Sequence, residues 1–402
     1  MMPSSLHSPR ARDALERLKP WAATAPRIQP TERAARLARA QALMQRLDLD
    51  MLLIVAGPSL RYFAGIPWTM SERVVAMLLP QTGHPIIVAP EFERGSLCAD
   101  LTIDAELSCW EEHEDPCALI VSHLRHHGAV HFAVDPQMPW WLAQGLTLAG
   151  APTLRDGAPV VDGCRMYKSA TELALIGQAM AMTLEVHRQA AMLLEPGITT
   201  TAVKRFIDDA HRALGADGGS TFCAVQFGVA TAYPHGLPGE QRLGADDLVL
   251  IDTGCTVDGY HSDITRTYAF GRPDPAQARV WAHEREAQQA AFDAVRPGVP
   301  CEQIDAVARA VLEGHGYGPE YRLPGLPHRT GHGLGLSIHE PAYLVRGDKR
   351  PLASGMCFSN EPMIVVPDTF GVRLEDHFHV TPEGAAWFTP PSTSFEDPFG
   401  LR

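Results

Sequence analysis

The stretch DLVLIDTGCTVDGYHSDITRTY, residues 247–268, decides the fold expected for the C-terminal part of the chain. Strand-forming residues stand on both sides of Asp258-Gly259, one of the strongest short-range signals for a β-hairpin turn. This turn makes Asp252 and Asp263 diagonal neighbours on one face, roughly 7–8 Å apart or less. An acid at the end of a buried apolar run is costly unless it is paired or coordinated. The hairpin therefore predicts two carboxylates that point the same way.

A second hairpin pattern follows in MCFSNEPMIVV (356–366) and VRLEDHFHV (372–380), which flank a Pro-Asp-Thr-Phe-Gly turn. It carries one acid on each strand, Glu361 and Glu375. A single acid of this kind usually caps a turn or forms a salt bridge. Four converging carboxylates, however, repel one another and are driven toward protonation, whereas two divalent cations cancel their charge. Oxygen ligands suit Mn, and Zn or Co also accept sites that mix oxygen with imidazole.

A fifth candidate ligand stands in HRTGHGLGLSIHE, residues 328–340. Glycines on both sides of His332 let the backbone approach a metal or a substrate closely. A lone histidine in a glycine loop is usually exposed or locally hydrogen-bonded, so it is the ordered set with the four acids that favours a ligand role.

A weak internal repeat suggests how the two hairpins are brought together. A long helix is expected to end at Leu194 and to begin at a cap on Ser169 or Thr171. Residues 193–218 resemble residues 294–319, and each segment carries a Pro-Gly pair at an equivalent place. Two helix–helix–hairpin halves predict a pseudo-twofold domain with a site between the halves.

The N-terminal part has a different pattern. Apolar residues at helical spacing in 31–47 are followed by short apolar runs typical of buried strands. These runs are 51–57, 74–80, 85–91 and 129–135. The chain is therefore expected to be α/β, with an N-terminal domain over 1–160 and a second domain over 165–402.

Composition narrows the classes of partner and compartment. The chain has 402 residues and a formal net charge of −13, with no basic run able to follow a phosphate backbone, so nucleic acid is not expected. The eight cysteines form no CxxC pair, which argues against zinc knuckles and a disulfide framework. No apolar run is long enough for a signal peptide or a membrane span. We expect a cytoplasmic protein without a membrane partner.

The ordered pattern resembles the pita-bread metallopeptidases, which include Xaa-Pro dipeptidase (prolidase), aminopeptidase P and methionine aminopeptidase. The resemblance covers about residues 165 to 385, and its motifs are Asp252, Asp263 eleven residues later, the Gly-His332-Gly loop, Glu361-Pro362 and Glu375-Asp376. It implies that Asp263, His332 and Glu361 bind one metal ion and Asp252 the other, with Asp263 and Glu375 bridging both. It also implies a bridging hydroxide as the nucleophile, with Glu361 carrying a proton to the leaving amine.

Three further histidines match the family's pattern. His235 and His339 resemble the histidines that stabilise the oxyanion at the substrate carbonyl. His328 is either a hydrogen-bond partner of the metal-bound groups or a wall of the pocket. These histidines and the separate N-terminal domain favour the proline-cleaving branch. The N-terminal domain resembles the creatinase-like domain of prolidases, which implies a homodimer in which this domain lines the partner's pocket.

One departure concerns the substrate carboxylate. Several prolidases hold it with an arginine at the position occupied here by Tyr343. Arg346 is the first replacement candidate, and Arg350 and Arg373 are others, because a guanidinium suits a carboxylate. Arg373 is equally suited to pair with the metal-binding acids.

The favoured function is an Xaa-Pro dipeptidase that acts with two divalent ions, with Mn preferred. Aminopeptidase P has the same ligands but accepts longer peptides. A lyase of this fold acting on dimethylsulfoniopropionate is a further alternative. Creatinase-like hydrolases and non-enzymatic binding proteins of the fold typically lack the full ligand set, which disfavours both.

Overall fold

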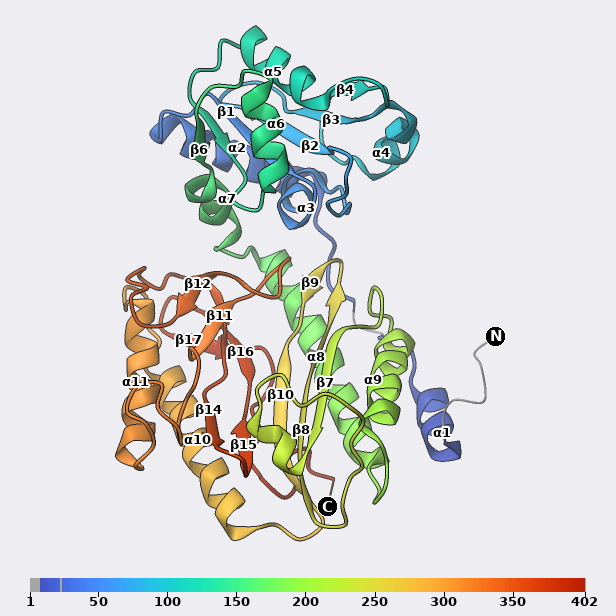
Figure 1. Ribbon diagram of the computed structural model, residues 1–402, viewed down its shortest axis with the longest axis vertical. Coiled ribbons are helices and arrows are strands. Elements are labelled where there is room, and N and C mark those ends of the chain that lie inside the picture. The colour runs from blue at the N-terminus through green and yellow to red at the C-terminus, as the bar shows by residue number, and fades with distance from the viewer. Residues whose placement is uncertain (1–7, 22–23, 402) are drawn as a thin grey trace. The chain divides into compact units, whose positions relative to one another are not determined.

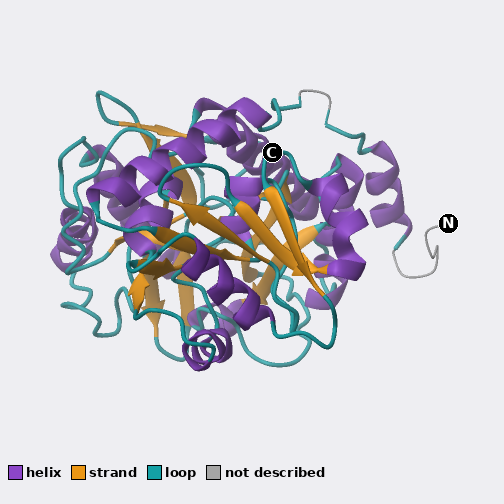
Figure 2. Ribbon diagram, turned by 90° about the horizontal axis from the view of Figure 1, so that it is seen from above, coloured by secondary structure: helices purple, strands orange, loops and turns teal. Residues whose placement is uncertain are grey.

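The computed structural model describes residues 8–21 and 24–401. They form two compact units, a smaller one over Ile28–Arg165 and a larger one that contains the residues before Ile28 and those from Met166 onward (Figure 1). We call the first the N-terminal unit. The second carries the site residues expected from the sequence, and we call it the catalytic unit after that expectation. Both combine helices with β-sheet, as predicted, and the strands lie inside flanking helices (Figure 2).

The N-terminal unit is built on one six-stranded sheet in the order β4-β3-β2-β1-β5-β6. Strands β1 to β3 are antiparallel neighbours, whereas the β3–β4, β1–β5 and β5–β6 pairs are parallel. The four predicted strands are present as β1, β2, β3 and β5, and the predicted helix is α2. The helices are α2 (Pro30–Arg46), α3 (Pro58–Ala64), η1 (Glu91–Glu93), α4 (Arg94–Asp100), α5 (Pro116–His126), α6 (Trp140–Leu148) and α7 (Ala158–Arg165). The strands are β1 (Met51–Val55), β2 (Ala76–Pro80), β3 (Ile86–Pro90), β4 (Glu106–Trp110), β5 (Phe132–Val134) and β6 (Leu154–Asp156).

The long helix α8 (Ala170–Leu193) begins at the predicted cap. The Ser169 side chain accepts a hydrogen bond from the Glu172 backbone N–H, and the Glu172 carboxylate accepts one from the Ser169 N–H. This reciprocal capping box satisfies two backbone donors that a helix start leaves open. Helix α8 belongs to the catalytic unit. The other helices of that unit are α1 (Pro9–Arg17), α9 (Thr200–Leu214), η2 (Gly228–Ala232), α10 (Pro275–Asp293) and α11 (Cys301–Gly314).

The strands of the catalytic unit form two larger sheets and one separate pair. One sheet has the order β10-β8-β7 and the other β12-β11-β13-β16-β17, while β14 pairs with β15. Helices α8 and α9 lie beside the first sheet and α10 and α11 beside the second (Figure 1). The strands are β7 (Ser220–Phe227), β8 (Asp247–Val257), β9 (Tyr260–His261), β10 (Ile264–Phe270), β11 (Gly331–Gly333), β12 (Glu340–Leu344), β13 (Cys357–Asn360), β14 (Met363–Val366), β15 (Phe370–Arg373), β16 (Asp376–Val380) and β17 (Ala385–Trp387).

The predicted pseudo-twofold repeat is visible at the two Pro-Gly turns. Gly197, between α8 and α9, and Gly298, between α10 and α11, have φ values of 87° and 89°, where glycine is favoured. The Gly197 N–H donates to the Leu243 carbonyl and the Gly298 N–H to the Leu352 carbonyl, both at 2.8 Å. The two helix pairs therefore start from the same local structure, which supports the predicted pair of halves.

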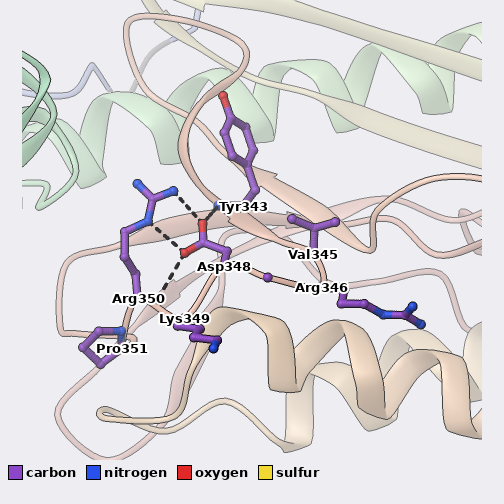
Figure 3. A pocket seen from close by; sticks show the side chains of 8 residues that line it. Tyr343, Val345, Arg346, Asp348, Lys349, Arg350 and Pro351 are labelled. Atoms are coloured by element: carbon purple, nitrogen blue, oxygen red, sulfur yellow. Dashed lines mark hydrogen bonds and ion pairs between the residues drawn. The ribbon is translucent and has the colours of Figure 1, made fainter. Parts of the chain in front are cut away.

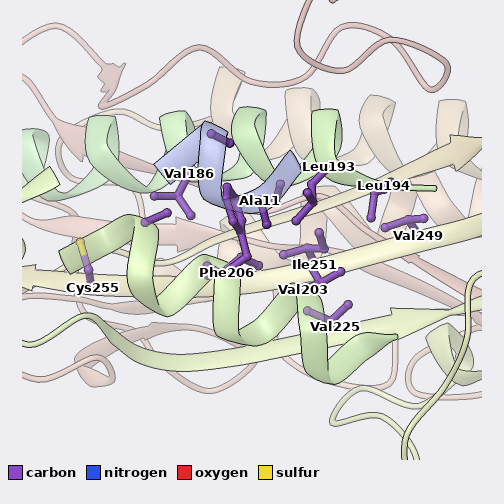
Figure 4. Close-up of a cluster of buried hydrophobic side chains, with 14 of the residues drawn as sticks. Ala11, Val186, Leu193, Leu194, Val203, Phe206, Val225, Val249, Ile251 and Cys255 are labelled. Atoms are coloured by element: carbon purple, nitrogen blue, oxygen red, sulfur yellow. The ribbon is translucent and has the colours of Figure 1, made fainter. Parts of the chain in front are cut away.

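Helix α1 is part of the core of the catalytic unit. Ala11 and Ala14 are buried among side chains of α8 and α9 such as Val186 and Phe206 (Figure 4). The sequence division at 160–165 leaves α1 in the N-terminal domain, whereas its apolar face lies in the core of the other unit. Within the described residues, no helix combines the length and the apolar character that crossing a lipid bilayer requires.

Candidate metal centre

The first hairpin places two aspartates as its turn predicts. Strand β8 pairs with β10 so that Asp252 faces Thr265, which puts Asp263 diagonally across on the same face. The return strand is interrupted between β9 and β10, at Ser262 and Asp263. Gly254 permits this break, because a Cβ there would lie 1.9 Å from the Ser262 carbonyl oxygen. Asp263 therefore leaves the regular ladder and is directed toward the site.

In the second hairpin, too, the strand pairing is interrupted where the acids stand. Asn360 pairs with Asp376 in the β13–β16 ladder, and Met363 pairs with Arg373 in the β14–β15 ladder. The register continues across the gap between the two ladders, so Glu361 and Glu375 stand opposite each other within it. All of the predicted acid ligands except Asp252 thus lie at interruptions of strands.

The two hairpins are joined at the metal-binding acids. Thr265 and Glu375 form an isolated bridge with backbone hydrogen bonds of 3.3 and 3.0 Å. The Thr265 hydroxyl also donates to Glu375 Oε2 at 2.8 Å. Beside them, the buried Arg266 forms an ion pair of 2.6 Å with Asp376. These contacts bring acids that are distant in sequence to one place.

His332 is presented by β11, whose glycines allow two close backbone approaches. A Cβ on Gly331 would lie 2.0 Å from the Ser359 carbonyl oxygen, and one on Gly333 would lie 2.3 Å from the Glu340 carbonyl oxygen. The His332 N–H donates to Ser359 Oγ at 2.8 Å, and that hydroxyl donates to Glu361 at 3.1 Å. One serine therefore orients two of the predicted ligands.

The ring of His332 is oriented for metal binding. Its Nδ1 donates to the Gly333 carbonyl at 2.9 Å, so the neutral ring carries its lone pair on Nε2. This Nε2 lies 3.3 Å from Glu361 Oε1, 3.7 Å from Asp263 Oδ2 and 3.9 Å from Glu375 Oε1. A lone pair that faces three carboxylate oxygens at this range is an arrangement that suits a cation between them.

Electrostatics within the centre lead to the same conclusion. Burial, and after it the neighbouring carboxylates, raise the pKa of Asp263 and of Glu375 well above the ordinary range. Burial also raises the pKa of Glu361, to about 7, and lowers the pKa of His332 well below its usual value. Within the described residues, Asp252 Oδ1, Asp263 Oδ1 and Glu375 Oε1 are buried without a hydrogen-bond partner. The donors therefore fit divalent cations, which would keep these acids ionised.

Asp252 stands apart from the other acids because an arginine holds it. Its Oδ2 lies 2.6 Å from the Arg373 guanidinium, which also donates to Thr265 Oγ1 at 3.2 Å. Arg373 is only 5% exposed, and Asp252 raises its pKa. Of its two expected roles, the contacts of Arg373 match pairing with a metal-binding acid.

The sequence patterns missed one residue of this group. Ligand atoms of Asp263, His332, Glu375 and His377 lie within 4.8 Å of one another. His377 follows Glu375 by two positions at the start of β16, and alternate residues of an extended chain share a face. This two-residue spacing is the sequence signal that could have identified His377. Burial lowers the pKa of His377 to about 3, so this ring is neutral and able to act as a ligand or a hydrogen-bond donor.

The predicted ligands and histidines line one cavity of about 590 Å³. His339 is exposed there, and its ring is perpendicular to that of His332 with centroids 4.2 Å apart. His328 donates from Nδ1 to the Arg329 carbonyl at 2.7 Å, and burial lowers its pKa to about 4. The lining residues are Phe222, Pro234, His235, Asp252, Asp263, Pro327, His328, Arg329, His332, Ile338, His339, Glu361, Arg373 and Glu375.

Tyr343 and Arg346, both expected at the substrate, are not among these lining residues. The Arg346 side chain is 57% exposed, and its guanidinium forms an ion pair of 3.0 Å with Glu320. Tyr343, Arg346 and Arg350 line a separate depression on the surface. Figure 3 shows Arg346 extending away from Tyr343, and Arg350 bound to Asp348. Arg329, which no sequence motif singled out, lines the cavity three positions before His332.

Residues 174–382, which carry all of the predicted metal ligands, match the metallopeptidase family M24. The chain belongs to this family. Residues 36–167 match the creatinase/prolidase N-terminal domain, which confirms the predicted order of a creatinase-like domain and a pita-bread M24 domain. The resemblance drawn from the ordered motifs is thereby confirmed.

Similar M24 proteins extend over most of the chain. A probable dipeptidase PepE of Mycobacterium bovis is 38% identical, over 88% of this chain and 93% of its own. An Xaa-Pro dipeptidase of Lactobacillus helveticus is 31% identical, over 88% and 96%. The crystal structure of dipeptidase PepE from Mycobacterium ulcerans superposes with a TM-score of 0.84 at 36% identity, covering 92% of this chain and 98% of that chain.

Proposed function

We propose that this M24 protein is an Xaa-Pro dipeptidase that uses two divalent cations, with Mn preferred and Zn or Co as alternatives. One observation carries the proposal: His332 Nε2 faces carboxylate oxygens of Glu361, Asp263 and Glu375 at 3.3, 3.7 and 3.9 Å in an open cavity. Hard oxygen donors with one imidazole suit these ions.

The ligand roles follow the predicted division. Asp263, His332 and Glu361 would hold one ion and Asp252 the other, with Asp263 and Glu375 available to both. When bound, such ions polarise a carbonyl and lower the pKa of water so that hydroxide forms near neutral pH. Arg373 holds the Asp252 carboxylate in place at the cavity through its 2.6 Å contact.

Other residues of the chain act on the peptide. Glu361 takes a proton from water and passes it to the departing amine, a transfer that amide cleavage requires. His235 and His339 donate hydrogen bonds to the substrate carbonyl oxygen, where charge develops during the reaction. Both line the cavity and are exposed.

The size of the cavity and the names of the relatives support a small substrate. About 590 Å³ falls within the usual range for sites of small molecules. Two similar proteins are described as a probable dipeptidase and an Xaa-Pro dipeptidase.

Metal-dependent turnover tests the proposal. Purified protein is stripped with a chelator, reloaded with Mn, Zn or Co, and assayed with Ala-Pro, Ala-Pro-Ala and dimethylsulfoniopropionate. We expect Mn-dependent release of alanine from Ala-Pro. Preferred cleavage of Ala-Pro-Ala identifies an aminopeptidase P, and turnover of dimethylsulfoniopropionate alone identifies a lyase. A fully active metal-free protein rules out the mechanism.

We also propose a cytoplasmic homodimer in which the N-terminal domain makes the dimer contact and lines the partner's pocket. All eight cysteines are free thiols, which supports a reducing compartment. Light scattering on the purified protein tests the oligomer, and a mass of one chain contradicts it.

A further inference from the structure

The cavity brings together more positive charge than its metal-binding acids need. Two of its described lining residues are arginines, Arg329 and Arg373. Two divalent ions neutralise the four carboxylates of Asp252, Asp263, Glu361 and Glu375. The loaded site therefore keeps the charge of its guanidinium groups and suits an anionic part of the substrate.

Arg373 is occupied by contacts within the protein. It is buried, and its guanidinium contacts Asp252 at 2.6 Å and Thr265 Oγ1 at 3.2 Å. Recruiting it to a substrate would break the contact that holds the Asp252 carboxylate in place.

Arg329 is not held by contacts of this kind. Within the described part of the chain its guanidinium forms no ion pair, and it lies over the Tyr343 ring at 4.4 Å from the centroid. This cation–π contact holds a partly buried guanidinium in position while its hydrogen-bond donors stay free.

We propose that Arg329, supported by the Tyr343 ring, binds the free C-terminal carboxylate of a dipeptide and so selects dipeptides over longer peptides. The inference rests on the proposed peptidase function and names the part of the site that sets substrate length. A planar guanidinium matches a carboxylate with two parallel hydrogen bonds. A peptide with a third residue has an uncharged amide at this point and loses the contact.

The first test compares Ala-Pro with Ala-Pro amide. Wild-type enzyme is expected to prefer the free acid by roughly 30-fold or more in kcat/KM, the scale for a desolvated charge pair. Arg329→Gln should lose most of this preference, mainly through a higher KM for the acid, because the contact is present before and during the reaction. Its kcat/KM on the amide should change less than about 3-fold.

Two further variants sharpen the comparison. Arg329→Lys keeps the charge but loses the paired geometry, so part of the preference should return. Arg346→Gln is the matched control, because this arginine is exposed and lies outside the cavity. It should behave as wild type on both substrates.

The proposed role of Arg329 is contradicted if wild-type enzyme cleaves Ala-Pro and its amide equally well. It is also contradicted if Arg329→Gln lowers kcat/KM for both substrates by the same factor. The same comparison with Ala-Leu and its amide separates this inference from proline specificity. Cleavage of Ala-Leu without Ala-Pro overturns the Xaa-Pro proposal, while a preference for the acid that Arg329→Gln abolishes still supports carboxylate binding by Arg329.

Discussion

His332, in β11, and His339, just before β12, lie seven positions apart and have different surroundings. His332 is 2% exposed and presents Nε2 to three carboxylates, whereas His339 is open to the cavity and outside the group of candidate ligands. The two rings touch, with centroids 4.2 Å apart. Burial and orientation therefore distinguish a candidate metal ligand, His332, from a histidine that is open to the cavity, His339.

This difference gives a prediction for two alanine variants. His339→Ala should lower kcat by roughly 10²–10³ through the loss of an oxyanion donor, while bound metal stays at the wild-type level. His332→Ala should lose metal. Steady-state kinetics and metal analysis of the purified variants test the distinction, and His339→Ala protein with the metal deficit of His332→Ala would move His339 into the ligand set.

The arginines show where residue-level prediction from sequence ends. For Arg373, pairing with one of the predicted metal-binding acids was one of two expected roles, and its partner is Asp252 on β8 of the other hairpin. Arg346 was chosen for its closeness in sequence to Tyr343, but its partner Glu320 comes from another loop. Arg329 contacts Tyr343 beside the β11–β12 pairing, in which His332 stands opposite Tyr343, and this pairing was not predicted from the sequence.

At the level of elements, the strands at the centre depend on glycines that permit backbone contact. Gly331→Ala forces a Cβ to within 2.0 Å of the Ser359 carbonyl, so β11 has to shift away from β13. We expect a loss of about 1–3 kcal/mol in the free energy of unfolding, the usual cost of overpacking, and weaker metal binding because His332 moves with the strand.

Gly314→Ala is the control for that variant. Gly314 ends α11, and a Cβ there has no atom within 4 Å. Alanine at this position should be neutral or stabilising by up to about 1 kcal/mol. Urea unfolding and metal titration of both variants provide the measurement, and equal stability of the two would remove the steric account of β11.

Elements of this unit were predictable where a local signal sets them. The Asp258-Gly259 turn fixes the pairing of Asp252 with Thr265, and Ser169 with Glu172 fixes the start of α8. The interruption at Asp263 was not predicted, because it depends on Gly254 meeting the Ser262 carbonyl within the folded sheet. The packing of α1 against α8 and α9 is likewise a long-range contact without a sequence signal.

At the scale of the whole molecule, metal and stability are linked through the buried acids. In the metal-free protein the pKa of Glu361 is raised to about 7, from 4.5 for an ordinary glutamate. Between these pH values the folded state holds a proton that the unfolded state has released. The stability of the metal-free protein therefore falls as pH rises from about 4.5 to 7, and Asp263 and Glu375 act in the same direction.

Divalent metal should remove this penalty. We predict that the difference in Tm between Mn-loaded and chelator-treated protein grows by at least about 3 °C from pH 5 to pH 7, because metal also competes with protons for the ligands. Metal-free Glu361→Gln should show a smaller loss of Tm over the same range. A difference in Tm that stays constant with pH would contradict the account.

The bridge between Thr265 and Glu375 has a consequence for how the protein is made. The acids of the first hairpin leave the ribosome about 100 residues before those of the second, which at bacterial or eukaryotic synthesis rates is an interval of roughly 5–20 s. During that time Asp252 and Asp263 have neither Glu375 nor His332 beside them, so their carboxylates remain in water. The centre is complete only when the second hairpin has been made and has packed against the first. Metal uptake by a newly made chain should therefore begin only after residues up to Glu375 have been synthesised.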